Sequence, residues 1–123
     1  MQTVMSDRRW AKAYPELGTG PVPAEPYISP AYFACERERV FQRVWLNVGR
    51  VEDMPKPGDY VVRDLAVCNT SIVLIRGDDG VVRGFHNVCS HRGNRVVLGE
   101  KGACRGYLTC NFHGWAYDNQ GQL

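Results

Sequence analysis

The sequence predicts a mainly β fold: a small antiparallel β domain that follows an extended N-terminal arm and one helix. After Trp45, short apolar runs alternate with Gly, Pro and Asp, a pattern typical of small all-β domains. Five of the seven prolines lie within the first 30 residues, and apolar residues at helical spacing follow them. The 123 residues, of which 44% are hydrophobic, are enough for one domain with a modest core.

Residues 1–43 are expected to form the arm and the helix. Each proline of the arm lacks a backbone N–H and restrains the residue before it, so this stretch cannot build a ladder of strand hydrogen bonds. Ser29 is suited to cap a helix that has Pro30 at its first position. Helical spacing then predicts one helix over about Ala31–Arg43, with an apolar side made of Phe33, Val40, Phe41 and Val44.

Residues 44–123 are expected to form the β domain. The first strands are predicted at Trp45–Val48, Tyr60–Val62, Ser71–Arg76 and Val81–His86. Between the last two of these, Gly-Asp-Asp-Gly at residues 77–80 predicts a hairpin turn. A second hairpin is predicted between Arg105–Thr109 and Ala116–Tyr117, with an exit turn at residues 118–121.

Several apolar residues are predicted to lie inside this domain. The aromatic core is expected to contain Phe41, Trp45 and Tyr60. Three cysteines are expected to be small buried hydrophobic residues, namely Cys35, Cys68 and Cys104.

The charge and the terminal segments exclude several classes of protein. The 15 basic and 13 acidic residues are spread along the chain and leave a net charge of +2, so nucleic acid is not an expected partner. No apolar stretch is long enough to cross a bilayer, and the first residues hold no signal-peptide core. A cytoplasmic protein without a membrane partner is expected. Five cysteines, an odd number without a secretory signal, favour metal ligation over a disulfide framework.

Two short segments each offer one thiol and one imidazole. Cys89 and His91 stand two residues apart, and Cys110 and His113 stand three apart. A glycine follows each pair and allows a sharp turn, so two loops could aim their side chains at one centre. A Cys2His2 set also suits zinc, but zinc fingers usually group cysteines with cysteines and histidines with histidines. The order Cys-His, then Cys-His favours a two-iron, two-sulfur cluster, with two thiolates on one iron and two imidazoles on the other.

The ligand segments resemble the motif pair in the N-terminal Rieske domain of bacterial aromatic-ring-hydroxylating oxygenase large (α) subunits. The matching residues are Cys89-x-His91-Arg92-Gly93 and Cys110-x-x-His113-Gly114-Trp115, supported by the segments 36–45, 48–50, 57–60 and 87–89. The resemblance implies a Rieske-type β-sandwich over residues 44–123. Rieske domains continue through further strands after the second ligand loop, so we expect this chain to be C-terminally incomplete, with the closing strands missing.

The same resemblance implies a function. Cys89 and Cys110 would bind the buried iron, and His91 and His113 the outer iron. Single electrons would pass from a ferredoxin or reductase to a mononuclear Fe(II) in the catalytic domain of a neighbouring subunit, within a dioxygenase of aromatic hydrocarbon catabolism. His86 is the only other histidine, so the chain is expected to lack that catalytic iron site and to perform no hydroxylation alone.

Some residues of the loops carry more specific expectations. Respiratory Rieske proteins brace the two loops with a disulfide, and no such cysteine pair is present here. Residue 111, often proline or a small residue in the oxygenase family, is Asn. His86 is expected in a structural or surface role, Arg92 at the surface, and Trp115 either in the core or as a shield of the cluster. The alternative function is a stand-alone Rieske ferredoxin, for which the arm and helix are unnecessary.

Overall fold

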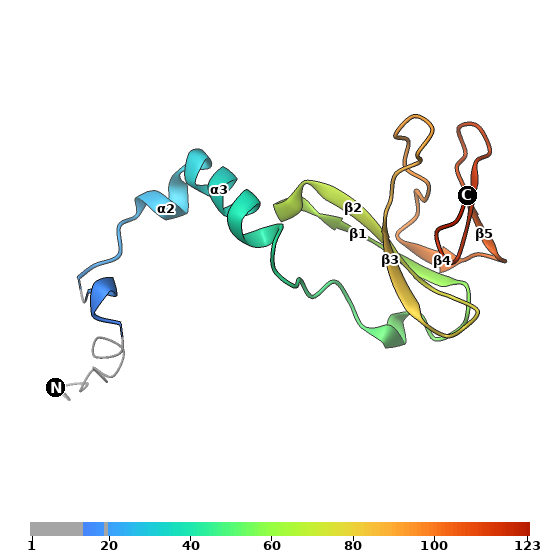
Figure 1. Ribbon diagram of the computed structural model, residues 1–123, viewed down its shortest axis with the longest axis horizontal. Helices are drawn as coiled ribbons and strands as arrows, with labels where there is room; N and C mark the ends of the chain where they lie inside the picture. The colour runs from blue at the N-terminus through green and yellow to red at the C-terminus, as the bar shows by residue number, and fades with distance from the viewer. Residues whose placement is uncertain (1–13, 19) are drawn as a thin grey trace. The chain divides into compact units, whose positions relative to one another are not determined.

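The computed structural model describes residues 14–18 and 20–123, and it divides into two compact units, Met1–Ala34 and Cys35–Leu123. Its α-helices and most of its strands are labelled in Figure 1. No helix in these described ranges is both long and apolar enough to cross a membrane.

The first unit contains short helical turns where an extended arm was predicted. A 3₁₀ turn spans Pro15–Leu17 and helix α2 spans Glu25–Ile28, each with proline in its first turn. Proline is tolerated there because the first N–H groups of a helix have no intrahelical partner. The described part of the arm holds no strand, as predicted, and the two short helical turns interrupt it.

Helix α3, Pro30–Glu36, continues into a wide π-helical turn at Arg37–Phe41 and confirms the predicted helix. The predicted cap is present: the Ser29 Oγ accepts a hydrogen bond from the N–H of Tyr32 at 3.2 Å. The π turn belongs to the second unit, and one of its side chains binds another segment of that unit: the Arg37 Nε donates to the Val67 carbonyl at 3.0 Å. The apolar side of this helix is only partly buried, since Phe33 is 40% and Val40 45% exposed.

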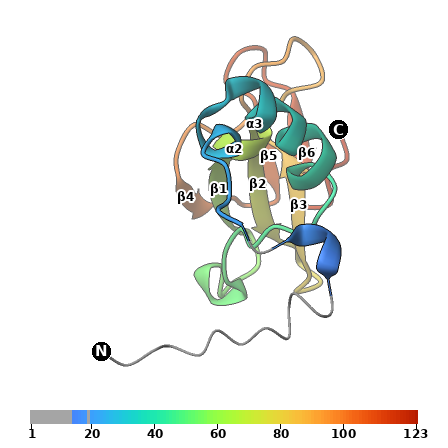
Figure 2. The same cartoon turned by 90° about the vertical axis from the view of Figure 1, so that its left-hand side faces the viewer.

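The second unit is built on a four-stranded antiparallel sheet with the order β3-β2-β1-β4, which Figure 2 shows side by side. A separate hairpin pairs β5 with β6. The strands are β1 Asp59–Leu65, β2 Thr70–Arg76, β3 Val82–His86, β4 Lys101–Ala103, β5 Tyr107–Thr109 and β6 Ala116–Asp118. Both predicted hairpins are therefore confirmed, as is the exit turn, in which the Gly121 N–H donates to the Asp118 carbonyl at 3.1 Å.

The central strand β2 buries both of its faces, and so it has a core on either side. Val73 and Ile75 face one core, which the β5–β6 hairpin covers through Leu108. Leu74 faces the other core together with Val61 and Met54. Successive strand residues point to opposite faces, which explains why three adjacent residues of β2 are buried. Tyr60 packs against the first core, as predicted.

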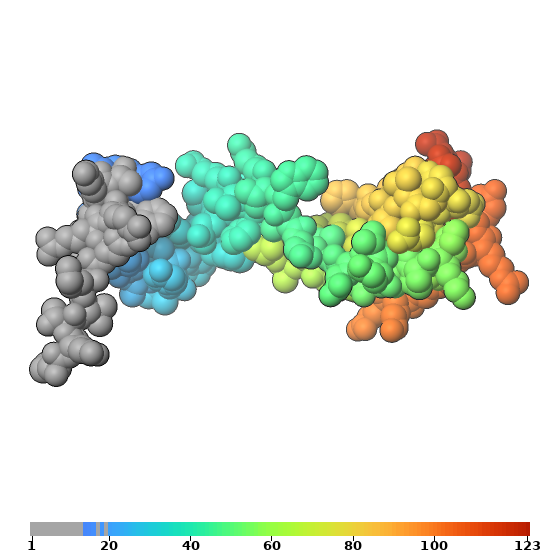
Figure 3. Space-filling model, turned by 90° about the horizontal axis from the view of Figure 1, so that it is seen from below, coloured from blue at the N-terminus to red at the C-terminus, as the bar shows by residue number. Residues whose placement is uncertain are grey.

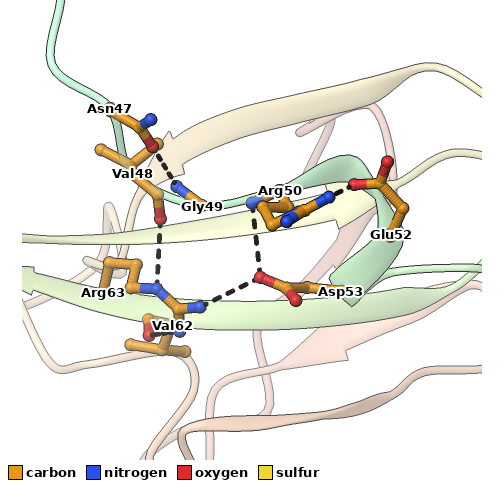
Figure 4. A network of polar contacts seen from close by, with 8 residues as sticks. All are labelled: Asn47, Val48, Gly49, Arg50, Glu52, Asp53, Val62 and Arg63. Carbon is orange, nitrogen blue, oxygen red and sulfur yellow. Dashed lines mark hydrogen bonds and ion pairs between the residues drawn. The ribbon is translucent and has the colours of Figure 1, made fainter.

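The segment before β1 is irregular, so the predicted strand at residues 45–48 was wrong. Side chains satisfy its backbone (Figure 4): the Arg63 Nε donates to the Val48 carbonyl at 3.1 Å, and the Asp53 carboxylate accepts from the Arg50 N–H at 3.3 Å. Trp45, expected in the core, is instead fully exposed in this chain, and Phe41 is half-buried. The apolar run at Trp45 was too short to distinguish a strand from a loop anchored by arginine.

A second arginine holds the same segment against the end of the sheet. The Arg76 guanidinium donates to the carbonyls of Met54 at 2.5 Å, Val51 at 3.1 Å and Gly80 at 2.6 Å. In Figure 3 this green segment and the yellow β2–β3 hairpin form one continuous surface. Met54 is thereby held over the second core, where only 1% of it is exposed.

Strand β4 was not predicted, because Lys-Gly-Ala carries no strand signal. It forms where glycine lets two backbones approach: the Cys104 N–H donates to the Gly58 carbonyl at 2.9 Å. A Cβ on Gly58 would overlap the Cys104 carbonyl oxygen, and the φ of Gly58 is +84°. A Cβ on Gly102 would likewise meet the ring of Tyr60, which lies across this strand.

Candidate metal centre

The predicted ligands lie on two loops with the same backbone hydrogen bonds. In the first loop, Cys89 N–H donates to Asn94 O at 2.7 Å, and Gly93 N–H donates to Cys89 O at 2.9 Å. The second loop has the same two bonds at the same spacing: Cys110 N–H donates to Trp115 O at 2.8 Å, and Gly114 N–H donates to Cys110 O at 2.9 Å. Gly93 and Gly114 both adopt the left-handed conformation, with φ of +72° and +74°. The loops project side by side from the same end of the unit (Figure 1).

The two thiols meet at the base of these loops and are buried. Cys89 is 3% and Cys110 2% exposed. Backbone N–H groups of the loop, first that of Phe112, lower the pKa of the Cys110 thiol, and the Asn94 amide and the Cys89 thiol lower it further. N–H donors directed at a sulfur favour its thiolate form, which is the form that binds metal.

A tyrosine from β6 contacts the other thiol. The Tyr117 hydroxyl lies 3.3 Å from the Cys89 Sγ and accepts a hydrogen bond from the Ser90 N–H at 2.9 Å. Since the backbone N–H supplies one proton to this oxygen, the hydroxyl proton is free to point at the sulfur.

The two imidazoles meet at the exposed tips of the loops. Ring centroids of His91 and His113 lie 4.6 Å apart at 76°, an edge-to-face arrangement. Trp115 is half-buried and stacks on His91, with centroids 4.9 Å apart and planes inclined by 16°. The ring of Phe112 lies 4.0 Å from that of His113. Aromatic rings thus cover the imidazole of His91 on one side and adjoin that of His113.

The donor set fits a two-iron cluster. Thiols gather with thiols inside the domain, and imidazoles gather with imidazoles at its surface, which is the division that a centre with two thiolates on one iron and two imidazoles on the other requires. Among residues 14–18 and 20–123, no cluster of three or more His, Cys, Asp or Glu residues has the arrangement for holding one metal ion.

Five further residues carried specific expectations, namely His86, Arg92, Cys35, Cys68 and Cys104. The His86 Nδ1 is 3.2 Å from the Thr70 Oγ1, in keeping with a structural role, and Arg92 is exposed as predicted. Cys35 was expected to be buried but is exposed, because it lies on a turn of α3 that has no buried residue. Cys68 and Cys104 are half-buried, and burial raises the pKa of Cys104.

Sequence reasoning missed two residues of the site, Asn94 and Tyr117. Neither carries a metal-ligand signal, and each touches a ligand only through tertiary contact. Their positions in the sequence could have pointed to them, because both lie next to the ligand motifs. Asn94 closes the first loop, and Tyr117 lies on the strand that follows the second loop.

A small antiparallel β domain that presents two such Cys/His loops has the architecture of an iron–sulfur protein of the Rieske class. The family model described as "Rieske [2Fe-2S] domain" matches residues 44–123, and the chain belongs to this family.

Its relatives are oxygenase subunits. The carnitine monooxygenase oxygenase subunit of Escherichia coli (strain K12) is 39% identical over 102 residues, which are 83% of this chain and 26% of the relative. The biphenyl 2,3-dioxygenase subunit alpha of Rhodococcus jostii (strain RHA1) is 35% identical over 105 residues, 85% of this chain and 22% of the relative. The chain therefore spans about a quarter of the length of these relatives and corresponds to their N-terminal part.

Solved structures agree with this assignment. The quaternary ammonium Rieske monooxygenase CntA, crystallised with gamma-butyrobetaine, matches with a TM-score of 0.76 and 36% identity over 82% of this chain and 28% of that one. Because the relatives include both a carnitine monooxygenase and a biphenyl dioxygenase, the predicted aromatic substrate is not established by the family.

Proposed function

We propose that Cys89 and Cys110 bind one iron of a Rieske [2Fe-2S] cluster and that His91 and His113 bind the other. The observation that carries this proposal is the pairing of like ligands: the thiols lie buried at the base of the loops and the imidazoles lie 4.6 Å apart at their exposed tips. When bound, the cluster would supply a centre that takes up and releases one electron.

The residues around the ligands suit such a centre. N–H groups and the Tyr117 hydroxyl face the sulfurs, where they would stabilise negative charge without exposing the thiolates to water. The exposed imidazoles would give a redox partner its closest approach, because the rest of the donor set is covered by protein. Trp115 excludes water from one face of His91.

In the wider reaction we assign this chain the electron-relay part of an oxygenase subunit. A ferredoxin or reductase would deliver the electron, and a mononuclear iron outside the 123 residues, in a catalytic domain of a neighbouring subunit, would receive it. This role rests on the names of the relatives described above, which are oxygenase subunits. We place the protein in the cytoplasm, where its five free cysteines would stay reduced.

The test is metal analysis of the purified chain. We expect about two irons and two acid-labile sulfides per chain, a red-brown colour and a paramagnetic signal upon reduction. His91→Ala and His113→Ala should each abolish that signal. His86→Ala is the matched control, since this histidine contacts Thr70 and lies outside the proposed ligand set. Stoichiometric zinc without sulfide, or a signal that survives both ligand variants, would refute the assignment.

A further inference from the structure

We propose that Asn94 and Asn111 form a clasp between the two ligand loops and act as positioning residues for the metal ligands. The Asn94 Nδ2 donates to the Asn111 Oδ1 across the gap between the loops, at 3.1 Å. The proposal adds to the ligand assignment above and, for its effect on the cluster, rests on it.

The orientation of the Asn94 amide is fixed by what surrounds it. Its Nδ2 lies 2.9 Å from the Arg95 carbonyl, 3.1 Å from the Asn111 Oδ1 and 3.7 Å from the Cys110 Sγ. All three partners accept hydrogen bonds, so the atom facing them is the nitrogen. An NH₂ group has only two hydrogens, and these are directed at the carbonyl of the next residue, Arg95, and at the second loop.

Asn94 and Asn111 are placed so that a bond between them can hold the two ligand loops together. The backbone bonds of each loop close within that loop, at Cys89–Asn94 and at Cys110–Trp115, and so they fix each shape but not the distance between the loops. Asn94 is the last residue of its closed loop, and Asn111 directly follows Cys110. A bond between them therefore connects the end of one loop to the residue beside a proposed ligand of the other.

The expected consequence is mechanical. With the clasp intact, the loops keep the thiols and the imidazoles at the separation that two irons need. Without it, the loops separate more often and expose the buried sulfurs, whose exposure is now 3% and 2%. The rate at which the cluster is lost to a chelator should therefore change before its redox potential does.

The experiment is a double-mutant cycle on the loaded full chain with Asn111→Ala, Asn94→Ala and both together. The first readout is the rate at which visible absorption is lost in excess iron chelator. Asn111→Ala should raise that rate about fivefold, the effect of one hydrogen bond of ordinary strength. In the Asn94→Ala background the same substitution should add nothing, because its partner is already gone. Asn111→Asp keeps an acceptor oxygen and should restore most of the slow rate.

The second readout does not need the metal. Hydrogen–deuterium exchange of peptides covering 89–94 and 110–115 should be faster in Asn111→Ala than in wild type, in the loaded and in the metal-free chain. Gln120→Ala, an exposed amide outside the loops, is the control and should leave both readouts unchanged.

The outcomes separate the two proposals. Equal rates in wild type and Asn111→Ala, or an effect of Asn111→Ala that persists undiminished without Asn94, would overturn the clasp. A wild-type chain that binds no iron would overturn the cluster assignment instead, and the exchange measurement would still decide whether the clasp exists.

Discussion

The Cys89 sulfur illustrates how single residues set the chemistry of this site. Its neighbour Tyr117 accepts one hydrogen bond from the Ser90 backbone and lies 3.3 Å from the sulfur. A metal-bound thiolate has no proton to donate, so in the loaded protein the hydroxyl would donate to the sulfur. A hydrogen bond to a metal-bound sulfur stabilises the reduced centre more than the oxidised one, because reduction adds negative charge.

Replacement of Tyr117 by Phe should therefore lower the midpoint potential of the loaded protein. Loss of about 1 kcal/mol of preferential stabilisation corresponds to about 40 mV for a one-electron couple. A spectroelectrochemical titration measures the change. Tyr107→Phe is the matched control, since Tyr107 lies on β5 and is 64% exposed. An unchanged potential in Tyr117→Phe would mean that the hydroxyl proton does not reach the sulfur.

At this scale the sequence predicted the candidate ligands but not the residues that surround them. Cysteine and histidine two or three positions apart, with glycine following, are recognisable because metal ligation restricts residue type and spacing together. Asn94 and Tyr117 act through contacts between loop and loop, or strand and loop, and their residue types are common in many other roles. The prediction that Trp45 lies in the core was wrong for a related reason: a hydrophobic side chain need not be buried within its own chain.

Among the elements, the β2–β3 hairpin is closed by an ion pair. The Arg83 guanidinium contacts the Asp79 carboxylate at 2.6 Å and lowers the pKa of Asp79 from 3.8 to about 2, with help from the Val81 N–H. Because the folded state holds the carboxylate in its charged form, this contact stabilises the fold above pH 3.8 and is lost as the pH falls toward 2.

Asp79→Asn should accordingly unfold at a lower urea concentration than wild type at pH 6. The two midpoints should converge as the pH falls from about 4 to 2, since protonation removes from the wild type what the substitution has already removed. Because both side chains are partly exposed, high salt should reduce the difference at pH 6 as well. A gap that stays constant down to pH 2 would show that the carboxylate charge is not its source.

A second prediction for the elements compares two glycines with similar backbone angles. Gly58 and Gly80 have φ of +84° and +77°, but a Cβ on Gly58 would overlap the Cys104 carbonyl whereas one on Gly80 meets nothing within 4 Å. Gly80→Ala should cost about 1 kcal/mol for the left-handed backbone alone. Gly58→Ala should cost at least about 3 kcal/mol, because β4 must also move away. Chemical denaturation measures both, and equal losses would contradict the close approach of the two backbones.

For the molecule as a whole, strongly patterned parts were predictable and parts that depend on distant partners were not. Strand β2 and its hairpin followed from a β-branched run and a Gly-Asp-Asp-Gly turn. Strand β4 could not be predicted, because Lys101–Ala103 forms a strand only where Gly58 admits its backbone. The loop held by Arg63 and Arg76 was also unpredictable, since its carbonyls accept hydrogen bonds from arginines that lie far along the chain.

We expect the two-stranded sheet of the second unit to depend more on a bound metal than the four-stranded sheet does. The β5–β6 hairpin is a two-stranded sheet, which is marginal by itself, and Leu108 is its buried anchor in the core. The ligand loop 110–115 joins β5 to β6, and the ligand loop 89–94 lies between β3 and β4, so a metal bound by both loops would tie the hairpin to the four-stranded sheet. Both thiols are among the buried residues. A metal that binds only the folded arrangement would stabilise it by mass action.

Removal of the iron should therefore lower the melting temperature of the chain by at least about 10 °C, which corresponds to about 2 kcal/mol for a domain of this size. Scanning calorimetry of the loaded and chelator-treated protein measures the difference. A variant that combines His91→Ala with His113→Ala should melt like the metal-free wild type, and chelator should not change its melting temperature. If the loaded and metal-free forms melted together, the buried thiols and the hairpin would be held by packing alone, and the metal would contribute nothing to the fold.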